Sequence, residues 1–153
     1  MVQNAKKLKL EPFGVGNWRL GIVSAQFNDH ITSQMQASVL ARAKRYGFKD
    51  SNITIAEVAG AVEIPLVLQK LADSGKYQAL VAIGCIIRGE TAHFEYVSQF
   101  VTQGILRIQL DKEIPIAFSV LTCDNEQQAL ARTKLSGEHL DAVLHQARLL
   151  RDM

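Results

Sequence analysis

The chain has 153 residues, which is the length of one ordinary domain and is enough to bury a core without a metal or a disulfide. Hydrophobic residues make up 48% of it and charged residues 21%, so the composition is that of a globular protein and excludes a disordered or collagen-like chain. The formal net charge is +2, and the basic residues are dispersed except at Lys6, Lys7 and Lys9, which makes nucleic acid a poor candidate partner.

Runs of β-branched residues and helical periodicity alternate along the chain. The β-branched runs predict strands at residues 19–25, 52–59, 79–87 and 114–122. Their apolar residues follow one another rather than alternate, which is typical of strands buried on both faces. The periodic segments predict helices from Asn28 or Asp29 to Gly47, from Pro65 to Gly75, from Ala92 onward, over 124–134 and over 138–153. Ser136 and Gly137 are expected to separate the last two helices.

The element order βαβαβαβαα predicts one α/β domain. Strands that alternate with helices of this length imply right-handed crossovers and a parallel sheet covered on both faces. We therefore expect a three-layer sandwich over residues 18–153, with residues 1–17 as a solvated N-terminal tail. In such sheets ligands bind beyond the carboxyl ends of the strands, so the loops there are the candidate sites.

The loop after the third strand offers the strongest chemistry. Residues 83–96 read IGCIIRGETAHFEY, a buried strand followed by a loop and the start of a helix. Backbone N–H groups from Gly89 to Thr91 and the helix N-terminus would form an anion pocket that suits a phosphate. His93 would exchange protons with a substrate bound there. Alternatively, Thr91 is only an N-cap and His93 a surface residue, and the charge of Glu90 would repel a phosphate unless it points away.

The other loops offer weaker candidates. Phe27, at the end of the first strand, would stack on a planar ligand or simply close the rim of the core. Glu63 would accept hydrogen bonds from sugar hydroxyls or merely favour the N-terminus of the second helix. Arg132 would clamp a phosphate or remain a solvated arginine near a helix C-terminus.

Several classes of site are not indicated. The histidines lack the spacing of metal ligands, and no glycine-rich nucleotide motif or nucleophile elbow is present, so we expect no metal site and no covalent catalysis. Cys85 and Cys123 lie in or at the end of apolar runs, which predicts buried, reduced thiols. No apolar stretch approaches the roughly 20 residues of a membrane span, so we expect a cytoplasmic protein without a membrane partner.

The string GCIIRGETAHFEYV resembles the signature segment of the 6,7-dimethyl-8-ribityllumazine synthases of riboflavin biosynthesis. The resemblance extends over AQFND, AGAVEIP and EIPIAFSVLTCDNEQQALAR, in the family's order and spacing, from about Trp18 to Arg148. It implies a flavodoxin-like fold with a four-stranded parallel sheet. It also implies a transferase that condenses 5-amino-6-(D-ribitylamino)uracil with 3,4-dihydroxy-2-butanone 4-phosphate, with no metal or organic cofactor.

The resemblance also implies a role for each matching residue. His93 would transfer protons, and Phe27 would stack on the pyrimidine ring. Further positions expected to contact the ribitylaminouracil are Ala61, Val62, Glu63, Cys85, Ile86, Ile87 and Phe118. The phosphate would be held by Glu90, Thr91 and Arg132. In the family a neighbouring subunit supplies the residues that match Phe118 and Arg132, so we expect a homopentamer, and some members pack twelve pentamers into an icosahedral shell.

This sequence departs from the family pattern in three places, the first of which is Glu90, where small residues are common. Ala59 and Val62 replace a usual proline and aromatic residue in the loop expected to hold the ribityl chain. The hinge TKLSGEHL is shorter than usual and carries His139 in place of a lysine. The other two departures keep open an alternative function, a non-catalytic lumazine- or flavin-binding homologue that keeps the oligomer. A nucleotide- or phosphosugar-binding module fits the fold but not the set of motifs.

Overall fold

The computed structural model describes residues 9–153, so Lys6 and Lys7 of the expected N-terminal tail lie outside it. The strands are β1 (Leu20–Ala25), β2 (Ile53–Val58), β3 (Ala79–Ile87) and β4 (Ile116–Cys123). The helices are α1 (Asp29–Arg45), α2 (Ile64–Asp73), α3 (His93–Lys112), α4 (Glu126–Leu130) and α5 (Leu135–Asp152), and short 3-10 turns, η1 (Asp50–Asn52) and η2 (Ala61–Glu63), precede β2 and α2. No helix in this described part is both long and apolar enough to cross a membrane.

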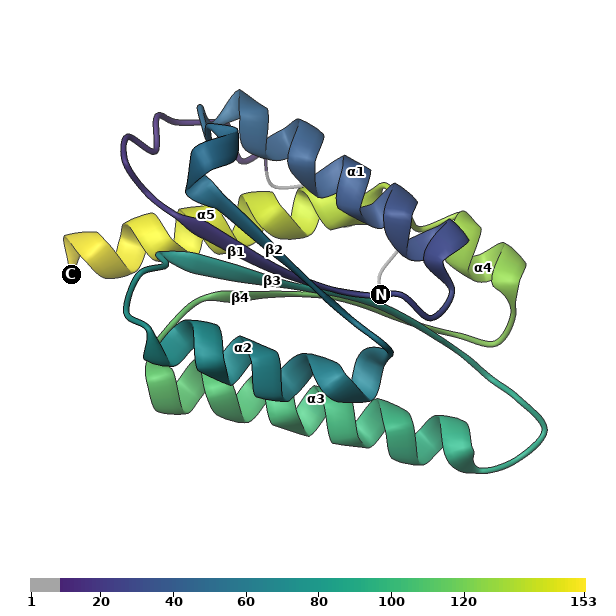
Figure 1. Ribbon diagram of the computed structural model, residues 1–153. Coiled ribbons are helices and arrows are strands. Elements are labelled where there is room, and N and C mark those ends of the chain that lie inside the picture. The colour runs from purple at the N-terminus through teal and green to yellow at the C-terminus, as the bar shows by residue number, and fades with distance from the viewer. Residues whose placement is uncertain (1–8) are drawn as a thin grey trace.

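The sheet confirms the predicted three-layer α/β architecture. Its four strands are all parallel and lie in the order β2-β1-β3-β4. Helices α1 and α5 cover one face, and α2 and α3 cover the other (Figure 1). The carboxyl ends of the strands, the starts of α1 and α3, and α4 lie at one end of the molecule. The loops that the sequence predicted to carry chemistry therefore meet there.

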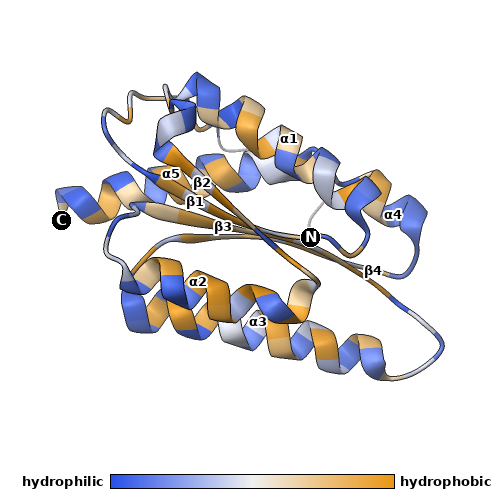
Figure 2. Ribbon diagram, in the orientation of Figure 1, coloured by the Kyte–Doolittle hydropathy of each residue, from blue (hydrophilic) through white to orange (hydrophobic). Residues whose placement is uncertain are grey.

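Two hydrophobic clusters, one on each face of the sheet, hold the layers together. One joins α1 and α5 to β1 and β3 around Tyr46, and Phe13 and Val15 pack into it ahead of β1. The other joins α2 and α3 to the opposite face around Leu68 and Val101. Figure 2 shows the strands to be mostly hydrophobic, while the helices mix hydrophobic and hydrophilic residues. Burial of this apolar surface is the main force that fixes the sheet beneath the site.

Strand β2 departs most from the predicted burial on both faces, and the other edge strand, β4, also exposes Phe118 and Thr122. The residues of β2 alternate between half-buried and exposed, with Ile55 40% exposed, whereas β1 is buried throughout. The reason is its position, because β2 lies at an edge of the sheet and has a single neighbouring strand. A continuous apolar run in the sequence therefore did not distinguish a central strand from an edge strand.

The prediction that Ser136 and Gly137 separate the last two helices was wrong. Both lie inside α5, which begins at Leu135, while α4 covers only Glu126–Leu130. At Gly137 the backbone of α5 contacts α1, because its N–H donates to the Ser38 hydroxyl at 3.1 Å. The glycine serves this close approach and does not interrupt the helix.

We expect Gly137→Ala to destabilise the protein by about 1 kcal/mol, although alanine is the better helix former. An added Cβ would lie 3.0 Å from the Ser38 hydroxyl oxygen and 3.3 Å from the Ser38 carbonyl oxygen, so α1 and α5 would have to separate slightly. Urea unfolding measures the change. In the Ser38→Ala background, which already lacks this hydroxyl and its two hydrogen bonds, the same glycine substitution should cost less. A Gly137→Ala variant more stable than the parent would contradict the packing argument.

Candidate active site

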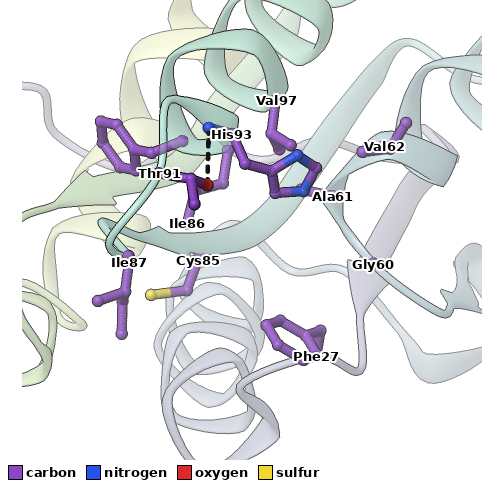
Figure 3. A pocket seen from close by; sticks show the side chains of 12 residues that line it. Phe27, Gly60, Ala61, Val62, Cys85, Ile86, Ile87, Thr91, His93 and Val97 are labelled. Carbon is purple, nitrogen blue, oxygen red and sulfur yellow. Dashed lines mark hydrogen bonds between the residues drawn. The ribbon is translucent and has the colours of Figure 1, made fainter.

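A cavity of about 360 Å³ opens at the carboxyl end of the sheet. The loops after β1, β2 and β3 and the first turns of α3 form its walls (Figure 3). Its lining residues are Phe27, Gly60, Ala61, Val62, Cys85, Ile86, Ile87, Gly89, Thr91, His93, Phe94 and Val97. The walls are thus mostly apolar with a few polar groups, which is the usual character of a small-molecule site.

Backbone hydrogen bonds hold the loop that carries Phe27. The N–H of Phe27 donates to the Ala59 carbonyl at 2.9 Å, which continues the pairing of β1 and β2 beyond the strands. The Phe27 side chain is 71% exposed and stands at the edge of the cavity. A large aromatic face held on a fixed backbone and open to solvent is suited to stacking on a planar ligand.

Asn28 links the first loop to the floor of the cavity. It lies at the N-cap of α1 in the left-handed region, with a φ of 64°, and its side chain does not cap the helix. Instead its amide Nδ2 donates to the carbonyl oxygen of Cys85 at 3.0 Å. Asn28 therefore fixes the end of β3 relative to the Phe27 loop, a role that its prediction as an ordinary N-cap did not include.

Glu63 serves the loop after β2. Its Oε2 accepts a hydrogen bond from the N–H of Gly60 at 2.9 Å, and the side chain is exposed outside the cavity lining. This contact favours the structural interpretation of Glu63, although the carboxylate lies one residue from the cavity wall at Val62.

Cys85 and Cys123 are buried free thiols, as predicted. Burial, followed by the nearby Cys123, raises the pKa of the Cys85 thiol to about 11. Cys85 is therefore a neutral thiol at physiological pH, although it lines the cavity. This agrees with the expectation that the site contains no covalent nucleophile.

The loop of residues 89–92 presents free backbone donors beside His93. Within the described chain, no hydrogen bond occupies the N–H groups of Gly89, Glu90 or Thr91. The Thr91 hydroxyl accepts from the N–H of His93 at 3.3 Å, the contact drawn in Figure 3. The His93 ring points into the cavity toward the walls at Ala61 and Val62. An anion held by the free N–H groups would lie next to the imidazole.

Besides Glu63, three of the expected site residues do not line this cavity. Glu90 is exposed outside it, so its charge need not oppose an anion there. Phe118 is on the edge strand β4, 40% exposed, in a separate hollow beside His139. Arg132 follows α4 and donates from Nη1 to the Gln128 carbonyl oxygen at 2.7 Å. One chain alone therefore does not bring the predicted phosphate clamp to the predicted phosphate site.

The cavity also contains two residues that the sequence did not single out for the site, Phe94 and Val97. A signal existed for Val97, because it is four residues after His93 and shares its side of α3. It was assigned to the apolar face of the helix alone. Gly89, which the sequence placed in the expected anion pocket, does line the cavity and has open space around it, with no heavy atom within 4 Å of an added Cβ.

Comparison with known proteins agrees with the resemblance in the sequence. A family model described as 6,7-dimethyl-8-ribityllumazine synthase matches residues 17–151. Proteins of that name from two strains of Clostridium kluyveri are each 41% identical over 140 residues, covering 88% of this chain and 91% of the relative. The chain therefore belongs to the 6,7-dimethyl-8-ribityllumazine synthase family.

Proposed function

We propose that this protein condenses 5-amino-6-(D-ribitylamino)uracil with 3,4-dihydroxy-2-butanone 4-phosphate to give 6,7-dimethyl-8-ribityllumazine. The observation that carries the proposal is a single cavity holding an exposed aromatic ring, a row of free backbone N–H groups and a histidine. These three features match a planar pyrimidine, a phosphate and a reaction made of proton transfers. Membership of the family supports the same substrates.

The chemistry requires no cofactor, and each step moves a proton. The 5-amino group attacks the butanone carbonyl and water leaves to form an imine. Loss of a carbon-bound proton then expels phosphate, and the resulting enol becomes a ketone. The ribityl-substituted nitrogen attacks this ketone, and loss of a second water closes the ring. His93 is positioned to accept and return protons, and the free N–H groups of residues 89–91 would stabilise the departing phosphate.

The two substrates would occupy different parts of the cavity. The pyrimidine would stack on Phe27, with its edge along the backbone of Cys85, Ile86 and Ile87, and the ribityl chain would follow the wall from Ala61 to Glu63. The butanone phosphate would lie between His93 and the loop that includes Glu90 and Thr91. Holding the two reactants in the correct relative position would supply a large part of the rate acceleration, because the amine is already a competent nucleophile.

We further propose that the site is completed in a homopentamer. Phe118 and Arg132 lie outside their own cavity and would enter the cavity of a neighbouring subunit. Large apolar side chains are exposed on α2, α3 and β4, namely Leu66, Tyr96, Phe100, Leu106, Leu110 and Phe118. A contact between two different surfaces, repeated around an axis, closes into a ring. Sedimentation velocity distinguishes a pentamer from a monomer and from an icosahedral shell of twelve pentamers.

The cytoplasm is the location we propose for the enzyme. Both cysteines remain free thiols, and disulfides are rare in that compartment. Fractionation of cells that produce the protein tests this assignment, because recovery outside the cytoplasm would contradict it.

Mixing the purified protein with both substrates and following lumazine absorbance tests the enzymatic function. Formation should be faster than in a protein-free control. For Arg132→Ala we expect KM for the butanone phosphate to rise roughly 10-fold to 100-fold, the loss of about 1.5–3 kcal/mol typical of a charged hydrogen bond. KM for the ribitylaminouracil should change little. Arg151→Ala removes an arginine at the opposite end of the protein and should leave both constants unchanged.

The alternative function, a homologue that binds a lumazine or flavin without turnover, makes a different prediction. The rate would equal that of the protein-free control, while the lumazine would still bind. Val62 lines the cavity and Ala59 anchors the Phe27 loop, so a looser ribityl site would then be the first explanation. Restoring a proline and an aromatic residue at these two positions would test that explanation directly.

A further inference from the structure

Arg88 connects the segments that surround the loop of residues 89–92. It is the first residue after β3, and its N–H donates to the Cys123 carbonyl oxygen at 2.9 Å, which extends the pairing of β3 with β4. Its Nε donates to Asp124 Oδ1 at 3.0 Å, and its Nη1 donates to Glu95 Oε1. The guanidinium also lies over the ring of Phe94, with Cζ 4.3 Å from the ring centre. One side chain thus contacts three separate residues.

Through these contacts, one guanidinium connects the two ends of the loop. Asp124 follows β4, Glu95 is in the first turn of α3, and Phe94 forms part of the cavity wall. The backbone of Arg88 starts the loop, and its side chain returns to the helix on which the loop ends. The free N–H groups and His93 both lie within this closed segment.

The contacts are too exposed to matter chiefly for folding. The side chains of Arg88, Glu95 and Asp124 are 44%, 46% and 64% exposed, and ion pairs at such positions contribute little to stability. A planar guanidinium nevertheless imposes direction, because its fork engages two carboxylates at fixed angles, whereas a lysine ammonium does not. The hydrogen bond from Arg88 also lowers the pKa of Glu95, which keeps that carboxylate charged and paired.

We propose that Arg88 is a positioning residue that aligns the free N–H groups of residues 89–91 with His93 for the phosphate-bearing substrate. The inference rests on the proposed function, because it deepens the account of the same site. Arg88 acts through the loop and through α3, and two nitrogens of its guanidinium, Nε and Nη1, already donate to carboxylates. It is therefore distinct from Arg132, the residue proposed to touch the phosphate.

Substitution of Arg88 should change the kinetics more than the stability. For Arg88→Gln we expect kcat/KM for the butanone phosphate to fall about 10-fold to 100-fold, since small misplacements at a site have effects of this size. The inhibition constant of inorganic phosphate should rise in parallel, while the melting temperature and KM for the ribitylaminouracil change little. Arg88→Lys keeps the charge but not the fork and should recover only part of the loss.

Arg151→Gln is a matched control for the loss of an exposed ion pair. Arg151 Nε donates to Asp152 Oδ1 at 3.0 Å, the same type and length of contact as that of Arg88 Nε with Asp124, at the far end of the protein. This variant should keep the parent kinetics. If Arg151→Gln and Arg88→Gln behave alike, Arg88 makes an ordinary surface ion pair and the proposal is wrong.

Glu95→Gln separates positioning from direct charge attraction. Removing this carboxylate frees a cation beside the phosphate loop, so attraction alone predicts tighter binding of inorganic phosphate. Positioning predicts that Glu95→Gln binds inorganic phosphate more weakly. It also predicts that the double variant Arg88→Gln/Glu95→Gln binds phosphate little worse than Arg88→Gln, because both substitutions break the same contact between Arg88 and Glu95. Tighter phosphate binding by Glu95→Gln would overturn the proposal.

Hydrogen exchange at the bonded amides that follow the loop, those of Glu95 and Tyr96, tests the same idea without catalysis. Exchange should be faster in Arg88→Gln than in the parent and unchanged in Arg151→Gln. If the parent protein is inactive, the proposed function fails while this measurement still decides whether Arg88 orders the loop. Equal exchange in the parent and Arg88→Gln would show that the loop keeps its structure without the guanidinium, and the inference would fail on its own.

Discussion

Replacing His93 by alanine should lower kcat by about 10²-fold without abolishing turnover, at the lower end of the effect of a positioned acid-base group. The imidazole points into the cavity beside the free N–H groups of residues 89–91, so its loss removes a proton carrier without disturbing the phosphate loop. The residual rate would come from holding the two substrates in register. Single-turnover measurements with both substrates saturating report this step.

Chemical rescue supplies the control for the His93 variant. Added imidazole should restore part of the activity of His93→Ala, because the vacated space adjoins the cavity, and it should not affect the parent. KM for both substrates should stay within about threefold of the parent value if His93 acts mainly in the transition state. An unchanged kcat would mean that water or the substrate phosphate moves the protons, which would remove His93 from the mechanism.

The sequence predicted the order of the elements and the end of the sheet where the site lies. Both follow from local information, because β-branched runs and helical periodicity mark the elements, and a parallel sheet has only one carboxyl end. The cavity confirms this location: it brings Phe27, His93 and the segment 85–87 together from loops far apart in the sequence. The resemblance to the family supplied the roles expected of these residues, and those roles remain proposals.

The errors concern features that depend on distant neighbours. Gly137 looked like a helix break because nothing near it in the sequence shows that Ser38 lies against it, 99 residues away. The edge position of β2 depends on the strand order, which a run of apolar residues does not contain. Asn28 does occupy the predicted N-cap of α1, but its amide donates to the Cys85 carbonyl oxygen and does not cap the helix. In each case a tertiary contact decided the outcome against a reasonable local rule.

Arg88 shows that the functional role of a residue can also depend on tertiary contacts that the sequence does not reveal. Its sequence position at the end of a strand left open whether it pairs locally or faces solvent. The structure shows three contacts, to Asp124, Glu95 and Phe94, and only the first two could be suspected from charge. A positioning residue of this kind has no recognisable sequence motif, because its role depends on which segments of the fold it connects.

The buried contact between α1 and α5 carries the second large expected effect. Asp141, which is 7% exposed, accepts a hydrogen bond from the hydroxyl of Tyr46 at 2.8 Å and pairs with Arg42. Tyr46 is itself 1% exposed, so its hydroxyl has no access to water in place of this partner. Asp141→Ala would leave both a buried hydroxyl and a half-buried arginine without their acceptor. We expect a loss of about 3 kcal/mol in the free energy of unfolding, near the lower end for breaking a buried pair.

Urea unfolding at one fixed protein concentration measures this loss, because an oligomer's stability depends on concentration. Tyr46→Phe removes only the hydroxyl and should cost about 1 kcal/mol. The double variant Tyr46→Phe/Asp141→Ala should lose less stability than the sum of the two single losses.

Burial, and to a smaller extent the hydrogen bond with Asp141, raises the pKa of Tyr46 above its ordinary value. The unfolded chain therefore releases the phenolic proton first, and stability should fall as the pH rises past about 10, by a smaller amount in Tyr46→Phe. Additive losses and an identical pH dependence would show that Tyr46 and Asp141 stabilise the helix pair independently.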